Sequence, residues 1–198
     1  MMGPFMAGIF WLVKQREMIR TGVRLIAKFA FLLYLLYGAV AWFYGGIERE
    51  RRRLSLVHTL VAVATASGFS FGIGRFWPRP RPFVTRRKKA WITHKDNPSF
   101  PSNHTMNGAV VTAAAFHCHS QAAPFLAIVT LVIGLSRVAC RLHYVSDLLG
   151  GIAVGLFSYA FTVSFAPFQR FSKCLLHFLA YVTDDLAPAF LQRRRSDR

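Results

Sequence analysis

Acidic residues are scarce in this sequence of 198 residues, where 8 Asp and Glu stand against 25 Lys and Arg and give a formal net charge of +17. Charged residues of both signs are also few, at 17%, while 54% of the residues are hydrophobic. This hydrophobicity excludes a disordered basic tail, and soluble domains carry about a quarter charged residues. The composition therefore predicts a membrane protein, and the length fits one domain over residues 1–198.

Metal-binding and disulfide patterns are absent as well. The three cysteines, Cys118, Cys140 and Cys174, have no CxxC or metal-ligand spacing, so we interpret them as structural thiols. Metal-binding sequences such as HExxH do not occur. The apolar start of the chain is followed by its basic residues instead of being preceded by them, which argues against a secretory signal. We expect no metal and no cofactor.

Long apolar runs are present, and a membrane-spanning helix needs about 20 mostly apolar residues. Five candidate spans result: Val23–Gly46, Leu54–Gly74, His104–His117, Ala122–Ala139 and Leu148–Phe168. Phe171–Leu191 is interrupted by acidic residues and a proline, so it resembles an amphipathic surface helix. The expected fold is an all-α, polytopic membrane helix bundle with about five to six transmembrane helices.

The basic loops predict the orientation. Glu48–Arg53 and Arg193–Arg195 are short and rich in arginine, which places both in the cytoplasm. Arg75–Asn103 and Arg141–Asp147 then lie together on the outer side. The first of these outer loops is itself strongly basic, contrary to the usual bias. Either the orientation is inverted, or the loop is an anion site that is kept basic.

Three clusters on this predicted side carry candidate chemistry. In the first, Arg75–Phe83, alternate prolines stiffen the backbone and present Arg79 and Arg81, whose guanidinium groups can bind phosphate oxygens through two hydrogen bonds. A rigid basic linker explains this cluster equally well. In the second, Ser99–His104, a helix cap would place free amides beside His104. Capping alone is the alternative.

The third cluster, Ser136–Asp147, contains His143 and Asp147 at a spacing of four residues, so that on a helix the two side chains face each other. A carboxylate on one imidazole nitrogen fixes the tautomer and raises the basicity of the other nitrogen. A purely structural pair is less expected here, because ionisable groups at membrane depth are costly and usually functional. Together, two histidines, a carboxylate and several fixed arginines suit metal-free phosphoryl transfer through a phosphohistidine.

These residues resemble the three-part motif of the type-2 phosphatidic acid phosphatase superfamily, Lys-x6-Arg-Pro, Pro-Ser-Gly-His and Ser-Arg-x5-His-x3-Asp. The third part matches at Ser136, Arg137, His143 and Asp147. The second part matches at Pro101, Ser102 and His104, with Asn103 in the place of glycine. In the first part Arg81 and Pro82 match, but Gly74 stands where lysine is usual, and Arg75 is the plausible substitute.

Within the superfamily, WPRPRPFV and Ile92–Asp96 are similar to the bacitracin-resistance-type undecaprenyl-diphosphate phosphatases of bacteria. The resemblance implies a multi-pass protein of the bacterial inner membrane that hydrolyses undecaprenyl diphosphate at its outer, periplasmic face and so recycles the cell-wall carrier lipid. A phosphatase for phosphatidylglycerophosphate, phosphatidate or lipid A is an open alternative. So is a non-catalytic membrane scaffold or transporter. A nucleic-acid partner is not expected, since no reading motif occurs, and no oligomeric state is indicated.

The resemblance also implies residue roles within the catalytic region 75–147. His143 would be the nucleophile, Asp147 would orient it, and His104 would protonate the leaving group and then activate water. The phosphate would be held by Arg75, Arg81, Ser102, Arg137 and the backbone amides at Asn103. Possible contacts to a second phosphate are Arg79, His94 and Lys95.

Overall fold

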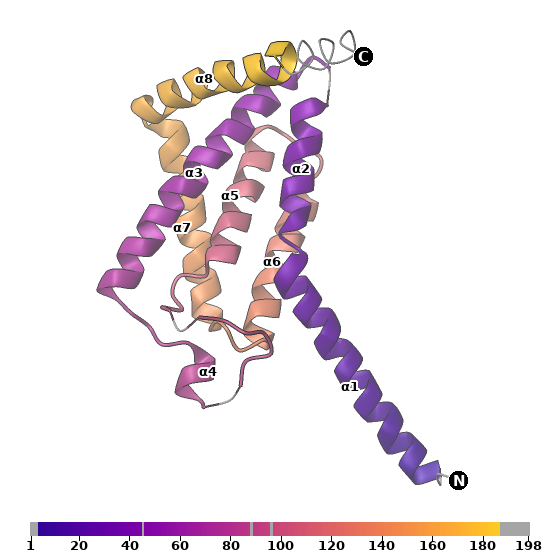
Figure 1. Cartoon of the computed structure of the whole chain (residues 1–198). Coiled ribbons are helices and arrows are strands. Elements are labelled where there is room, and N and C mark those ends of the chain that lie inside the picture. Colours follow the sequence, from indigo (N-terminus) through magenta and orange to yellow (C-terminus); the bar gives the residue numbers. More distant parts are fainter. Residues whose placement is uncertain (1–3, 45, 88, 96, 187–198) are drawn as a thin grey trace, which may run out of the picture.

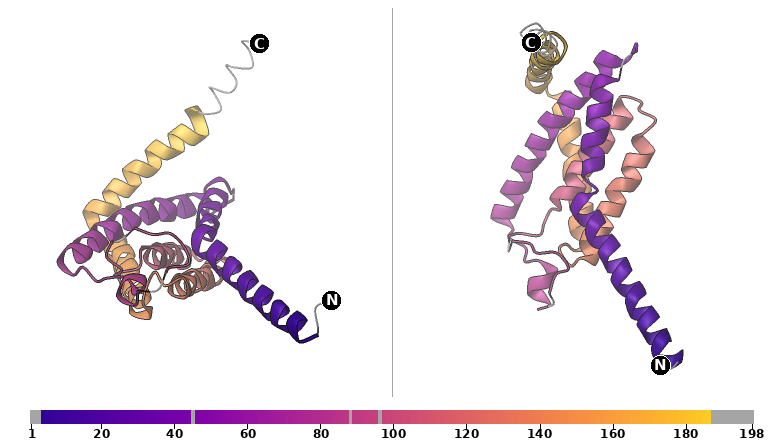
Figure 2. Two further views of the ribbon diagram at one scale, coloured as in Figure 1. Left: turned by 60° about the horizontal axis from the view of Figure 1, so that its bottom comes forward. Right: turned by 45° about the vertical axis from the view of Figure 1, so that its right-hand side comes forward.

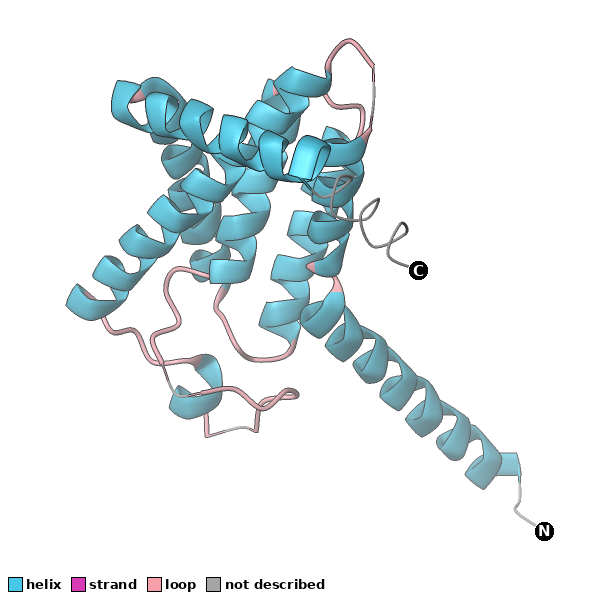
Figure 3. Ribbon diagram, turned by 45° about the horizontal axis from the view of Figure 1, so that its top comes forward, coloured by secondary structure: helices cyan, strands magenta, loops and turns pink. Residues whose placement is uncertain are grey.

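The computed structural model describes residues 4–44, 46–87, 89–95 and 97–186. The helices in these ranges are α1 (Pro4–Phe29), α2 (Leu32–Phe43), α3 (Arg49–Phe76), α4 (Pro82–Thr85), α5 (Asn103–His117), α6 (Ala123–Ala139), α7 (Val145–Ser164), α8 (Ala166–Tyr181) and the short π-helical turn η1 (Val182–Leu186) (Figure 1). The described residues contain no strand (Figure 3). The predicted all-α class is confirmed.

The predicted span Val23–Gly46 is wrong as a single helix. The chain leaves α1 after Phe29 and enters α2 at Leu32 with a bend of 44°. At the bend, Nη1 of Arg137 donates a hydrogen bond of 3.2 Å to the carbonyl of Ala27. In a continuous helix that carbonyl would accept the amide four residues later. Before the bend, α1 extends away from the bundle (Figures 1 and 2).

The apolar helices agree with a membrane environment. Among the described residues, α3 and α7 are each long and apolar enough to span, and the bent α1–α2 pair makes a third candidate. The helices α5 and α6, with 15 and 17 residues, are about 22 and 25 Å long, below the roughly 30 Å of a hydrocarbon core. Two or three spans thus meet the criteria of length and composition, fewer than the five expected.

The core forms around α5, which packs against α3, α6 and α7. Met106 and Val110 of α5 are buried against Ala62 and Ala66 of α3. On α7, the backbone of α5 comes so close that a Cβ added at Gly151 would lie 2.7 Å from the carbonyl oxygen of Ser102. Gly155, four residues later, meets the carbonyl of Met106 in the same way. This spacing of small residues lets two helices pack closely and sets the start of α5 against the start of α7.

The loops divide the bundle into two ends. The α3–α5 connection, which contains α4, and the α6–α7 turn lie at one end, while the α2–α3 and α5–α6 connections and α8 lie at the other (Figure 1). The prediction that Arg75–Asn103 and Arg141–Asp147 share one end is therefore confirmed. Which end faces the cell exterior remains a prediction.

The helix α8 crosses the far end of the bundle and packs on α3 (Figures 1 and 3). Ser172 and Leu176 are buried on its inner face, while Phe171 and Phe178 are exposed. This is the amphipathic surface helix predicted over Phe171–Leu191, although it begins earlier, at Ala166. Residues 187–191 and the tail Arg193–Arg195 lie outside the described ranges.

Candidate active site

A cavity of about 540 Å³ lies where the three predicted clusters meet. It is lined by seven of the predicted site residues: Arg75, Arg81, His94, Asn103, His104, Arg137 and His143. These residues come from α3, the α3–α5 connection, α5, α6 and the α6–α7 turn. Segments that are more than sixty residues apart in the sequence, such as Arg75 and Arg137, therefore contribute to one polar pocket.

The imidazole of His143 is buried and held in one tautomer. Its Nδ1 lies 2.8 Å from the backbone carbonyl of Ser99. A carbonyl oxygen only accepts hydrogen bonds, so Nδ1 carries the proton and Nε2 keeps its lone pair. Nη1 of Arg81 lies 3.3 Å from Nε2. The unprotonated nitrogen, which is the one able to attack phosphorus, thus lies beside a guanidinium group in the cavity.

Asp147 does not orient His143 in the way that helical spacing predicts. His143 precedes α7, which begins at Val145. One carboxylate oxygen of Asp147, Oδ2, accepts the amide of Tyr144 at 2.8 Å and so caps the helix. The same oxygen is 3.6 Å from Nδ1 of His143, longer than a hydrogen bond. The direct contact that orients the ring is the Ser99 carbonyl, and the fully buried Asp147 carboxylate adds its charge nearby.

Arg79 is engaged away from the cavity, contrary to its predicted contact with a second phosphate. Its Nη1 donates to Oδ1 of Asp147 and to Oγ of Ser146, each at 2.7 Å. The guanidinium lies over the ring of Tyr144 at 4.1 Å. The buried carboxylate attracts this arginine more strongly than an open cavity does. Lys95 also does not line the cavity, so of the three predicted second-phosphate contacts only His94 does.

Arg81 is buried and held by protein acceptors. Its Nε and Nη2 donate to the backbone and side-chain oxygens of Asn97, and its Nη1 donates to the carbonyl of Leu142 at 2.9 Å. Arg137 is also buried, but its Nε has no hydrogen-bond partner among the described residues. A buried charged donor without an acceptor is costly. Arg137 lines the cavity, so an anion bound there would lie beside this guanidinium.

The first turn of α5 faces the cavity with Asn103 and His104, but not with Ser102. Ser102 is fully buried and its hydroxyl pairs with that of Thr105 at 3.0 Å, so its side chain does not line the cavity, and its contact with phosphate stays a prediction. Amides in the first turn of a helix have no acceptor within the helix. Those of Asn103 and His104 are therefore available to an anion, as the capping pattern predicts.

The electrostatics of the cavity favour the neutral form of its loop histidines. Burial lowers the pKa of His143, and the charges of Arg81 and Arg137 lower it further. Burial is also the main cause of the lowered pKa of His94. A cavity lined by three arginines and by the neutral imidazoles of His94 and His143 has a net positive charge. Its ligand is accordingly expected to be an anion.

Comparison with known proteins identifies the class. The family model of the PAP2 superfamily matches residues 55–171, which include every residue of the cavity, and the chain belongs to this superfamily. Undecaprenyl-diphosphatase BcrC of Bacillus subtilis (strain 168) is 29% identical over 160 residues, 79% of this chain and 77% of BcrC. Phosphatidylglycerophosphatase B of the same strain is 28% identical over 151 residues, 70% of this chain and 69% of that protein.

A solved structure supports the fold. The PAP2-type phosphatidylglycerolphosphate phosphatase from Bacillus subtilis matches with a TM-score of 0.55 and 24% identity, over 79% of this chain and 77% of that chain. The resemblance stated from the sequence motifs is confirmed by the family model, and the chain is a member of the PAP2 phosphatase superfamily.

Sequence reasoning missed three contributors to the site. Ser99 acts through its backbone carbonyl and Asn97 through contacts to Arg81, and neither leaves a recognisable pattern. Ser70 of α3 donates to Asn103, which only the fold brings near. The four-residue spacing of Gly151 and Gly155 within an apolar run does indicate close helix packing from the sequence alone.

Proposed function

We propose that this protein hydrolyses a lipid diphosphate, most consistently undecaprenyl diphosphate, to the lipid monophosphate and inorganic phosphate. The observation that carries the proposal is the presentation of the His143 Nε2 lone pair in a cavity that His104, Arg81 and Arg137 also line. Three guanidinium groups, counting Arg75, suit a polyanionic headgroup. The relation to BcrC supports the undecaprenyl substrate.

In the proposed reaction, Nε2 of His143 attacks the terminal phosphorus while the bond to the bridging oxygen breaks. Arg81 and Arg137 stabilise the equatorial oxygens of the transferred group. The imidazolium of His104 protonates the departing lipid phosphate. Neutral His104 then removes a proton from water, which attacks the phosphohistidine, releases phosphate and restores His143.

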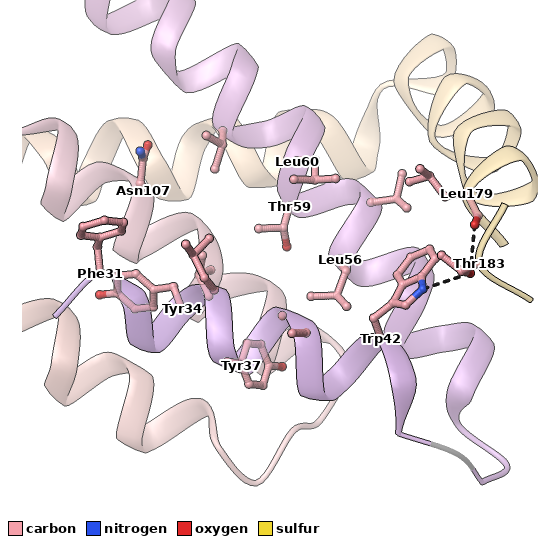
Figure 4. A pocket seen from close by; sticks show the side chains of 16 residues that line it. Phe31, Tyr34, Tyr37, Trp42, Leu56, Thr59, Leu60, Asn107, Leu179 and Thr183 are labelled. Atoms are coloured by element: carbon pink, nitrogen blue, oxygen red, sulfur yellow. Dashed lines mark hydrogen bonds between the residues drawn. The ribbon is translucent and has the colours of Figure 1, made fainter. Parts of the chain in front are cut away.

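An apolar cavity supports a lipid as the substrate. It measures about 520 Å³ and lies between α2, α3, α5 and the end of α8 (Figure 4). On α3 the apolar cavity is lined by Leu56, Leu60 and Val63. The catalytic cavity is lined by Ser67 and Ser70, which follow Val63 on α3 by one and two turns. The two cavities thus follow one face of α3, as a phosphate headgroup and its apolar chain require.

The similarity to Phosphatidylglycerophosphatase B favours phosphatidylglycerophosphate as the second candidate substrate. Purified full-length protein is assayed for phosphate release from undecaprenyl diphosphate, phosphatidylglycerophosphate, phosphatidate and lipid A, each with EDTA. We expect the highest kcat/KM on undecaprenyl diphosphate and no loss of rate with EDTA. A strict requirement for Mg²⁺ would refute the histidine mechanism.

The same assay separates an enzyme from a non-catalytic scaffold. His143→Ala is expected to lower the rate on the order of 10³-fold or more, because the nucleophile is lost. A chain that releases no phosphate from any of these lipids would instead be a scaffold or transporter. We further propose that the cavity opens to the outer side of a bacterial inner membrane, as the Arg-rich cytoplasmic loops indicate.

A further inference from the structure

The side chain of Asn103 is held in a fixed orientation at the edge of the catalytic cavity. Asn103 is the first residue of α5, and the hydroxyl of Ser70 on α3 donates to its Oδ1 at 2.6 Å. Because this bond occupies the carbonyl oxygen, it turns the amide nitrogen, with its two N–H groups, away from Ser70. In the described part of the chain that nitrogen has no acceptor, although the residue lines the cavity.

Arg75 lines the same cavity from α3, a little more than one turn after Ser70. Its guanidinium makes no hydrogen bond or ion pair within the described ranges. It differs in this from Arg81, which contacts both His143 and the backbone of Leu142. Two donor groups on the α3 side, the Asn103 amide and Arg75, are therefore available to a ligand and distinct from the donors around the nucleophile.

The position of the lipid chain decides which phosphate these donors meet. Under the proposed function, the transferred phosphate lies at Nε2 of His143, and the lipid chain follows α3 past Ser67 and Val63. The phosphate that stays attached to the lipid must lie between these two points. Among the donors that line the cavity, Arg75 belongs to α3 and the Asn103 amide is positioned by Ser70 of α3, so these two are the candidates to bind that phosphate.

We propose that the side-chain amide of Asn103, positioned by Ser70, and the guanidinium of Arg75 bind the phosphate that remains on the lipid. This subsite makes the enzyme selective for lipid diphosphates over lipid monophosphates. When the bond between the terminal phosphorus and the bridging oxygen breaks, negative charge develops on the departing lipid phosphate. The N–H donors of Asn103 and Arg75 stabilise that charge. A lipid monophosphate has no such group, so it gains nothing from the subsite. The inference rests on the proposed function.

The test compares two substrates of equal chain length, farnesyl diphosphate and farnesyl monophosphate, with the purified full-length protein. Asn103→Gly removes the amide and is expected to lower kcat/KM for the diphosphate about tenfold, the value of a charged hydrogen bond. The substitution keeps the backbone amide, so the monophosphate should lose much less, and the ratio of kcat/KM for the diphosphate to kcat/KM for the monophosphate should fall. Thermal unfolding in detergent reports the folding of each variant.

Variants of Ser70 test the positioning. Ser70→Ala should lower the ratio of kcat/KM for the diphosphate to kcat/KM for the monophosphate by a smaller factor than Asn103→Gly does, because the Asn103 amide can then rotate. Ser70→Thr keeps a hydroxyl and should have the ratio of the unmodified protein. Thr65→Ala is the matched control, since this α3 hydroxyl donates to the carbonyl of Val61 and not to the cavity. It should leave the ratio unchanged.

Equal losses on both substrates, or an unchanged ratio in Asn103→Gly, would overturn the inference while leaving the phosphatase activity intact. If the unmodified protein hydrolyses neither farnesyl substrate and no undecaprenyl diphosphate, the proposed function fails and the inference fails with it.

Discussion

Nη1 of Arg81 lies 3.3 Å from Nε2 of His143, on the nitrogen of the ring that does not carry the proton. The guanidinium is held by Asn97 and Leu142, so it stays in place when the imidazole reacts. This arrangement keeps a positive charge beside the nucleophilic nitrogen and the oxygens that it will acquire. Both the attack and the phosphohistidine benefit from that charge.

Arg137→Lys should weaken phosphate binding strongly. The guanidinium of Arg137 is buried, lines the cavity and donates through Nη1 to the carbonyl of Ala27, and a single ammonium group cannot replace this planar fork of donors. We expect inhibition by vanadate, a phosphate analogue, to weaken about 10- to 100-fold. Near-normal inhibition and kinetics would count against this contact.

Asp147→Asn should lower kcat much more than it changes KM, because the charge near His143 is lost while the phosphate ligands remain. The variant should also unfold more easily, by about 1–3 kcal/mol, since the ion pair with Arg79 is lost. Arg79→Gln is the matched variant, which removes the same ion pair but keeps the carboxylate. It should show the stability loss with a smaller loss of kcat. A pure change in affinity in Asp147→Asn would contradict its role near the nucleophile.

The pKa of His143 should lie below the ordinary histidine value of about 6.5, because the ring is buried beside two arginines. The neutral, nucleophilic form therefore persists as the pH falls through 6.5. In the unfolded chain the ring takes up its proton near pH 6.5, so protonation of this residue favours unfolding only as the pH falls below that value. Histidine NMR spectra recorded over a range of pH measure the pKa of His143, and the His143→Gln variant identifies its signal. A midpoint above 6.5 would disprove the assigned environment.

Gly155→Ala should destabilise the fold by about 1–3 kcal/mol, because the added methyl group meets the backbone carbonyl of Met106. The control is Gly68→Ala on α3, where nothing lies within 4 Å of the added atom. That variant should be neutral or slightly more stable, since alanine favours a helix over glycine. Thermal unfolding in detergent compares the two. Equal effects would mean that the close α5–α7 packing is not a source of stability.

The helical class and the location of the cavity could be predicted from the sequence, because apolar runs and the three charged clusters are local patterns. The bend between α1 and α2 could not, since neither proline nor glycine occurs at Ala30 and Phe31, and the side chain that bonds the carbonyl of Ala27 at the bend, Arg137, is more than a hundred residues away. The position of Arg79 outside the cavity could not be predicted either, because the carboxylate that it pairs with, Asp147, is brought near only by the fold. The orientation of His143 by the backbone of Ser99 is likewise invisible in the sequence, because any residue supplies a carbonyl.

Rapid quenching with undecaprenyl diphosphate labelled in its terminal phosphate shows whether His143 takes up the phosphoryl group. We expect label on His143, in an intermediate that accumulates in His104→Ala, where water is no longer activated, and that is absent from His143→Ala. Label on a different residue, or turnover by His143→Ala at the unmodified rate, would contradict this expectation.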